Sequence, residues 1–176
     1  MMYKPNVVIT GHSFVRRFEA YLCKGGDRRV KRDLNLPRSA QISLHGIGGR
    51  TVDKLTAFDL HSVGIINPDI VILEIGSNDL CSREAKPETV GSKIEALVQH
   101  LHARFHVKFI VVCQTINRTV CPQVTPGYND RVALLNRYLR VVLDAIPCAK
   151  FWSHKGLCEP NVPILCQDGV HLNKQG

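Results

Sequence analysis

The chain has 176 residues, of which 44% are hydrophobic and 22% charged, and its formal net charge is +8. This length and apolar content suit one domain with a buried core and exclude an intrinsically disordered chain. No apolar run approaches the roughly 20 residues of a membrane span, and Met-Met-Tyr-Lys-Pro is not the start of a signal peptide. We therefore expect a protein of the cytoplasm, or of the nucleus.

Short apolar runs alternate with amphipathic stretches along the chain. The run at 69–75 is continuous and β-branched, which is typical of a parallel strand covered on both faces. The stretch 88–106 gathers its apolar residues on one face of a helix. The expected strands are 6–10, 42–45, 69–75, 109–113 and 149–153. The expected helices are 13–23, a helix capped by Thr51 and running through Val63, 88–106, 130–146, and a last one from His171.

Strands and helices alternate in a pattern that predicts an α/β fold, with a parallel sheet between helices. In such sheets, ligands bind beyond the carboxyl ends of the strands. A polar turn follows each of the first three strands, and we expect the three turns to meet at one rim. The long loop 114–128 is of the kind that borders a site. The three turns are Gly11-His12-Ser13, the segment 46–51, and Gly76-Ser77-Asn78-Asp79.

Ser13 follows the first strand and begins a helix, whose N-terminus favours developing negative charge. Taken alone, a serine there is more often a simple N-cap than a nucleophile. Asp168 and His171 are three residues apart, so one turn can set the carboxylate against the imidazole and fix its tautomer. In a chain with eight histidines, such a pair alone also fits a loop aspartate beside a surface histidine.

Two of the turns carry hydrogen-bond donors without bulk. The backbone N–H of Gly49 and the side-chain amide of Asn78, with the N–H of Ser13, are able to aim three hydrogen bonds at one oxyanion. The alternative interpretation of both segments is structural. The glycines at 46–49 would then serve a loop with positive φ, and the segment 76–79 would be an ordinary turn.

These segments stand in the order of a known family. Gly11-His12-Ser13, Gly48-Gly49-Arg50-Thr51, Gly76-Ser77-Asn78-Asp79 and Asp168-Gly169-Val170-His171 resemble the four blocks of the SGNH (GDSL-type) hydrolases, and the resemblance runs from Val7 to His171. It implies a single esterase domain over residues 1–176, a flavodoxin-like three-layer α/β/α sandwich with about five parallel strands. It also implies a serine esterase without cofactor that acts on acyl, acetyl or lipid esters.

The resemblance implies a role for each site residue. Ser13 would be the nucleophile, His171 the base and Asp168 the residue that orients it. Ser13, Gly49 and Asn78 would form the oxyanion hole. His12 stands where the family usually has aspartate, and it places an extra titratable group beside the nucleophile.

Two segments point to a narrower group. Residues 11–17 and 168–173 are similar to the esterase domains in first-open-reading-frame proteins of some non-LTR retrotransposons. That resemblance implies a protein that acts alongside element RNA, with a lipid or membrane role for the esterase.

A basic segment lies between Arg16 and Arg38 and is opposed by only three acidic residues. It predicts an anionic partner, RNA or acidic membrane, although a solvated helix end has the same composition. The alternative function is therefore a catalytically weak or inactive SGNH-fold module that binds through this face. The basic residues are Arg16, Arg17, Lys24, Arg28, Arg29, Lys31, Arg32 and Arg38.

Other kinds of site are disfavoured. Val15 stands where the nucleophile elbow of an α/β-hydrolase requires glycine. The sequence has neither a GxxxxGK[ST] motif nor GxGxxG after its first strand, which argues against NTPase and dinucleotide sites. The seven cysteines form no CxxC pair and are expected to be reduced. No metal site is predicted, because the histidines considered are scattered: His12, His45, His61 and His171.

Overall fold

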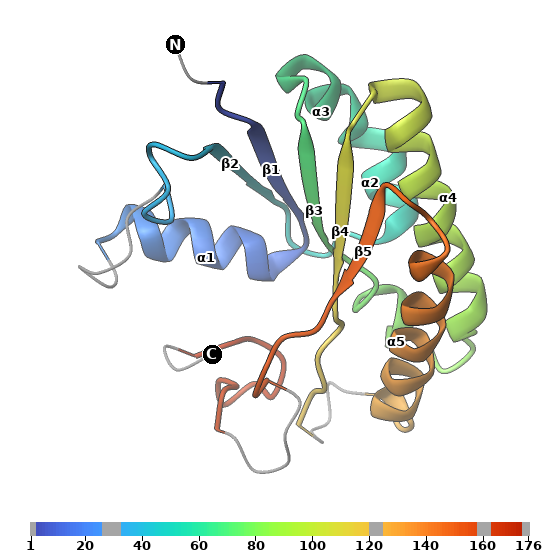
Figure 1. The fold of residues 1–176 in the computed structure, drawn as a ribbon. Helices are drawn as coiled ribbons and strands as arrows, with labels where there is room; N and C mark the ends of the chain where they lie inside the picture. The colour runs from blue at the N-terminus through green and yellow to red at the C-terminus, as the bar shows by residue number, and fades with distance from the viewer. Residues whose placement is uncertain (1–2, 26–32, 120–124, 158–162, 174–176) are drawn as a thin grey trace.

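The computed structural model describes residues 3–25, 33–119, 125–157 and 163–173. Five parallel strands form one sheet in the order β2-β1-β3-β4-β5 (Figure 1). This is the flavodoxin-like strand order, so the predicted α/β class and five-stranded parallel sheet are confirmed. The strands are β1 (Asn6–Gly11), β2 (Gln41–Gly46), β3 (Ile70–Glu74), β4 (Phe109–Cys113) and β5 (Ala149–Trp152).

Helices cover the two faces of the sheet unequally (Figure 1). On one face, α1 (Ser13–Cys23) packs against β1 and β2. The short 3-10 helix η1 (Asp79–Cys81) follows β3. The face of the sheet opposite to α1 carries α2 (Val52–Phe58), α3 (Leu60–Ile66), α4 (Pro87–Phe105) and α5 (Tyr128–Asp144).

In the described ranges, no helix has the length and apolarity to cross a bilayer.

The main core lies between the sheet and the helices α2 to α5. Alternate residues of a strand point to opposite faces, so Val71 and Leu73 of β3 enter this core while Ile72 points to the α1 side. A smaller cluster of Val15, Leu22 and Leu44 holds α1 against β2. Burying each such side chain contributes about 1.5–3 kcal/mol, so the larger core dominates the stability of the sheet.

Two predicted helices differ in the structure. The segment after Thr51 is two helices, since α2 ends at Phe58 and α3 begins at Leu60. The residue between them, Asp59, accepts two hydrogen bonds of 2.7 Å from the Arg50 guanidinium. Thr51 caps α2 as predicted, because its side chain accepts from the N–H of Lys54 at 3.3 Å.

No helix begins at His171 in the part of the chain that the structure describes. Leu172 instead forms an antiparallel bridge with Leu165, which keeps the segment extended. Five of the seven cysteines lie in the described ranges and are free thiols, and Cys121 and Cys158 lie outside them.

Candidate active site

The last residues of β1 and β3 approach each other closely at the carboxyl edge of the sheet. A side chain at Gly11 would place its Cβ 2.0 Å from the carbonyl oxygen of Glu74, and the φ of Gly11 is +154°. A Cβ at Gly46 would lie 2.0 Å from the backbone nitrogen of Arg16. Only glycine permits these approaches. They bring the segment around Ser13 against the ends of β2 and β3.

The three predicted triad residues lie in one hydrogen-bonded chain. The Nε2 of His171 is 3.1 Å from the Oγ of Ser13, across 158 positions of sequence. The Nδ1 of the same ring is 2.7 Å from Oδ2 of Asp168. The other carboxylate oxygen accepts the backbone N–H groups of Val170 and His171, both at 2.9 Å. A hydroxyl, an imidazole and a carboxylate are thus connected in that order.

Asp168 is held in its ionised form. The backbone N–H of His171, the imidazole of that residue and the N–H of Val170 hold the pKa of Asp168 well below its usual range. An ionised carboxylate at this distance places the imidazole proton on Nδ1. The lone pair of Nε2 then faces Ser13, which is the tautomer that a general base requires.

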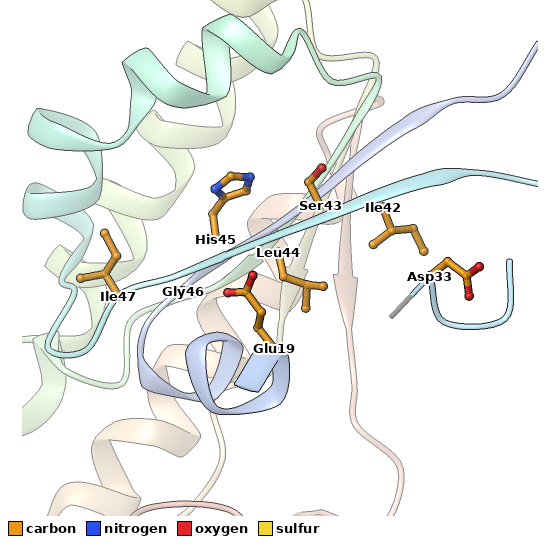
Figure 2. Close-up of a pocket in the computed structure, with 8 residues that line it drawn as sticks. All are labelled: Glu19, Asp33, Ile42, Ser43, Leu44, His45, Gly46 and Ile47. Carbon is orange, nitrogen blue, oxygen red and sulfur yellow. The ribbon is translucent and has the colours of Figure 1, made fainter. Parts of the chain in front are cut away.

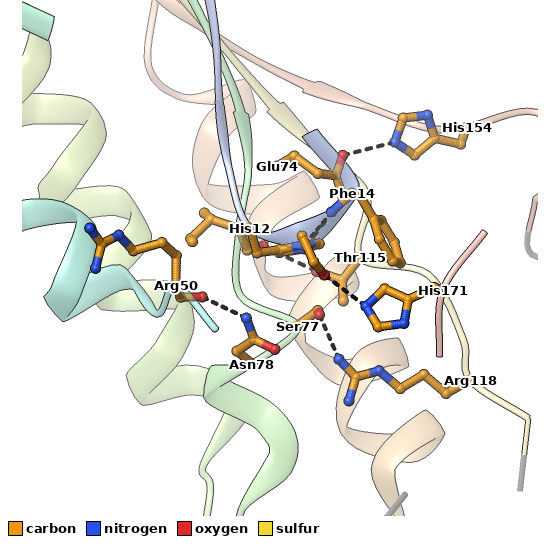
Figure 3. Close-up of polar contacts among 12 residues, drawn as sticks. His12, Phe14, Arg50, Glu74, Ser77, Asn78, Thr115, Arg118, His154 and His171 are labelled. Carbon is orange, nitrogen blue, oxygen red and sulfur yellow. Dashed lines mark hydrogen bonds and ion pairs between the residues drawn. The ribbon is translucent and has the colours of Figure 1, made fainter. Parts of the chain in front are cut away.

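Asn78 is fixed by the neighbouring turn. Its side-chain amide donates to the carbonyl of Arg50 at 2.8 Å (Figure 3). An amide carries two N–H groups, so one remains for another acceptor. Gly49, which precedes Arg50, has an N–H that forms no hydrogen bond among the described residues. The two predicted donors therefore belong to segments that are tied together.

The next residue, Asp79, holds the start of α2. Its carboxylate oxygens lie 3.1 and 3.3 Å from the N–H of Val52. Burial raises the pKa of Asp79 to about 6, although the hydrogen bond from Val52 works in the opposite direction. Ionisation of Asp79 is therefore less favourable in the folded protein than in the unfolded chain.

The difference in stability between Asp79→Asn and the wild type should favour the variant more at pH 7.5 than at pH 4.5. The folded-state pKa is raised above the usual 3.8, so the stability that the group contributes is complete below 3.8 and is lost as the pH rises through about 6. The difference in free energy of unfolding between variant and wild type should shift by about 2 kcal/mol between the two pH values. Urea unfolding of both proteins measures this, and a difference that does not depend on pH would contradict it.

Sequence reasoning did not single out Arg118, in the loop 114–128. Its side chain is only 7% exposed, and its Nη2 donates to the Oγ of Ser77 at 2.9 Å (Figure 3). The guanidinium stacks 4.5 Å above the Tyr128 ring. The adjacent N–H of Thr119 donates to the carbonyl of Gly169 at 2.9 Å. This loop therefore joins the turn after β3 to the turn that precedes His171.

His12 is buried, and its Nδ1 accepts the N–H of Phe14 at 3.4 Å, so it caps α1. Burial lowers its pKa to about 4, opposed by the nearby Glu74 carboxylate. The imidazole is therefore neutral near pH 7. The titratable group that the sequence places beside Ser13 adds no charge there.

Comparison with known proteins gives the family. A model of the GDSL-like lipase/acylhydrolase family matches residues 10–176. The chain belongs to this family. No curated protein matches it. The four-block resemblance read from the sequence is confirmed at the level of this family.

Solved structures share the fold of this chain. LAE5, an α/β hydrolase from the metagenome of Lake Arreo in Spain, is 19% identical with a TM-score of 0.72, covering 99% of this chain and 90% of its own. The Axe2 acetyl-xylooligosaccharide esterase of Geobacillus is 16% identical, with a TM-score of 0.71 and coverages of 97% and 88%. A GDSL-like lipase of Bacteroides thetaiotaomicron is 15% identical, with a TM-score of 0.67 and coverages of 98% and 84%.

Two hollows in the surface differ in their position relative to the predicted triad residues. One of about 750 Å³ runs along β2 and is lined by residues such as Glu19, Ser43 and His45 (Figure 2). None of the predicted site residues lines it. The other, of about 500 Å³, lies on the α1 side of the sheet and reaches Phe14 and Leu172, the sequence neighbours of Ser13 and His171.

Only part of the basic segment lies in the residues that the structure describes. Arg16 and Arg17 are exposed on α1, and the Arg16 guanidinium lies next to Gly48 in the turn after β2. Lys24 and Arg38 are also exposed. The remaining basic residues lie outside the described ranges: Arg28, Arg29, Lys31 and Arg32.

Proposed function

We propose that this protein is a serine esterase that hydrolyses carboxylic esters, in a single domain spanning residues 1–176 and located in the cytoplasm or the nucleus. The observation that carries the proposal is the connected chain from Ser13 through His171 to Asp168, with contacts of 3.1 and 2.7 Å. The Nε2 of His171 takes the hydroxyl proton while the Oγ of Ser13 attacks the ester carbonyl. Asp168 stabilises the imidazolium that results.

The carbonyl oxygen becomes negatively charged in the tetrahedral intermediate. The N–H of Ser13 is one of the first N–H groups of α1, which have no partner inside the helix. With the N–H of Gly49 and the second amide hydrogen of Asn78, it stabilises this oxyanion. The alcohol leaves with the proton from His171. Water then attacks the acyl group on Ser13, with the same base and the same donors.

The substrate is a small ester or a lipid ester. Among the solved structures of the same fold is an acetyl-xylooligosaccharide esterase, which makes an acetyl ester the first substrate to test. The assay follows p-nitrophenolate release from p-nitrophenyl acetate, butyrate and octanoate by the wild type and by Ser13→Ala. Turnover of any of the three by the wild type alone supports the proposal. Equal rates for the two proteins on all three esters overturn it.

A second activity is proposed for the basic segment, in which Arg16 and Arg17 are exposed. In addition, residues 11–17 and 168–173 are similar to esterase domains of retrotransposon first-open-reading-frame proteins. We propose that the protein is such a domain and that the segment binds a polyanion. Affinity for single-stranded RNA or for phosphatidylserine vesicles should fall at least ten-fold between 50 and 200 mM salt, since three or more phosphate contacts release counterions.

Fluorescence anisotropy with the RNA and sedimentation with the vesicles measure this affinity. Charge reversal at Arg16 and Arg17 should reduce both the affinity and its dependence on salt. Binding that does not depend on salt, or none at 50 mM salt, would contradict the prediction. Salt-dependent binding together with no ester turnover would identify the chain as the binding module alone.

A further inference from the structure

Three side chains that the esterase mechanism does not use meet at the carboxyl ends of β3, β4 and β5. Glu74 ends β3, Cys113 ends β4, and His154 lies two residues after the end of β5. A carboxylate oxygen, a thiol sulfur and an imidazole nitrogen of these residues all lie within 4.8 Å of one another. Glu74 and Cys113 stand on neighbouring parallel strands and His154 follows the next strand, so the pairing of these strands brings the three groups together.

This geometry suits a divalent metal ion. Zinc bonds of about 2.0–2.3 Å place the ligand atoms of a tetrahedron about 3.3–3.8 Å apart. The Nε2 of His154 already lies 3.4 Å from Oε2 of Glu74 (Figure 3). Thiolate, imidazole and carboxylate are the donors that zinc takes, whereas magnesium and calcium take oxygen alone. We propose that Glu74, Cys113 and His154 bind Zn²⁺ or a similar transition-metal dication.

His12 supplies a second, independent indication of a ligand. Its side chain is 1% exposed, and its Nε2 has no hydrogen-bond partner among the described residues. That nitrogen lies 3.8 Å from Oε1 of Glu74, the oxygen opposite the one that faces His154. Because Nδ1 accepts from Phe14, Nε2 carries the ring proton, and it faces the carboxylate at a distance too long for a hydrogen bond. In metal sites, a donor at this position is an outer-sphere partner that orients the carboxylate ligand.

The site is open on one side. Glu74, Cys113 and His154 all line the hollow of about 500 Å³ on the α1 side of the sheet. That hollow gives an ion a route to the three ligands and leaves room for an exogenous fourth ligand, as in zinc sites with three protein ligands. Bound metal would join the ends of three strands.

Cobalt(II) titration of the metal-free, fully reduced protein tests the site. One equivalent should bind and give visible d–d bands of tetrahedral cobalt, with a near-ultraviolet charge-transfer band from a thiolate ligand. Zn²⁺ should displace the cobalt and abolish both. Cys113→Ser should remove the charge-transfer band. Cys148→Ser is the matched control, a partly buried cysteine that packs on the main core, and it should retain the band.

His154→Ala keeps the thiol but removes a proposed metal ligand. Loss of an outer-sphere partner weakens metal binding roughly 10- to 100-fold, and this variant should weaken Co²⁺ binding by more than that. His154 is only half-buried beyond the end of β5, so this variant carries the test if Cys113→Ser does not fold. A wild type that takes up neither metal, a charge-transfer band that survives in Cys113→Ser, or unchanged affinity in His154→Ala would overturn the proposal. Ser13→Ala should bind the metal like the wild type, so this result does not depend on the esterase activity.

Discussion

Ser13→Ala should lower the turnover of p-nitrophenyl acetate on the order of a million-fold. Alanine removes the oxygen that attacks the ester and leaves His171 without the hydroxyl that lies 3.1 Å from its Nε2. Ser13 begins α1, but His12 caps that helix, so the substitution leaves the cap in place. Steady-state kinetics on the purified proteins measure the effect, and circular dichroism checks that the variant is folded.

Ser92→Ala is a suitable control for that comparison. Ser92 is exposed on α4, on the face of the sheet opposite to α1, and its hydroxyl contacts Tyr138 at 3.0 Å. Its loss should leave turnover within two-fold of the wild type. A folded Ser13→Ala protein that keeps one hundredth or more of the wild-type turnover would show that another group is the nucleophile.

Asn78→Ala should lower kcat roughly a hundred- to a thousand-fold with little change in KM. The side-chain amide is proposed to donate to an oxygen that gains its charge only in the transition state, so its loss affects the chemical step more than substrate binding. The substitution also removes the 2.8 Å hydrogen bond to the carbonyl of Arg50. That loss should reduce the free energy of unfolding by about 1 kcal/mol.

Asp59→Ala separates these two effects of the Asn78 substitution. It removes the carboxylate that anchors the Arg50 guanidinium through two bonds of 2.7 Å, and so it loosens the same turn without removing a proposed oxyanion donor. Its kcat should fall no more than about ten-fold. A comparable loss of kcat in both variants would show that Asn78 acts by holding the turn alone.

Local patterns predict the regular elements well and the interruptions poorly. The helix 13–23 and the strand 109–113 have the predicted bounds, because an apolar repeat marks the helix and a continuous apolar run marks the strand. The division between α2 and α3 coincides with the ion pair of Arg50 and Asp59, a side-chain contact that periodicity does not report. The extended path after His171 depends on the bridge between Leu172 and Leu165, which is set by the folding of the loop that carries them.

Some residues of the candidate sites are predictable from the sequence, and others are brought together only by the fold. Ser13, Asn78 and His171 stand in segments that share an order along the chain with a known family, and the strand ends indicate that their turns converge. Glu74 and Cys113 are the last residues of two strands and belong to no motif, so their meeting with His154 follows only from the lateral order of β3, β4 and β5. Strand order is a tertiary property. For this reason a survey of histidines in the sequence predicts no metal site.

Labelling with an alkyl fluorophosphonate tests the proposed nucleophile most directly. The reagent phosphonylates a serine whose hydroxyl is activated by a neighbouring base, and it needs no knowledge of the natural ester. We predict one covalent adduct per protein molecule, mapped to Ser13 by peptide mass spectrometry and lost in His171→Gln. An adduct on a different serine, or labelling of Ser13→Ala at the wild-type rate, would contradict the proposed triad.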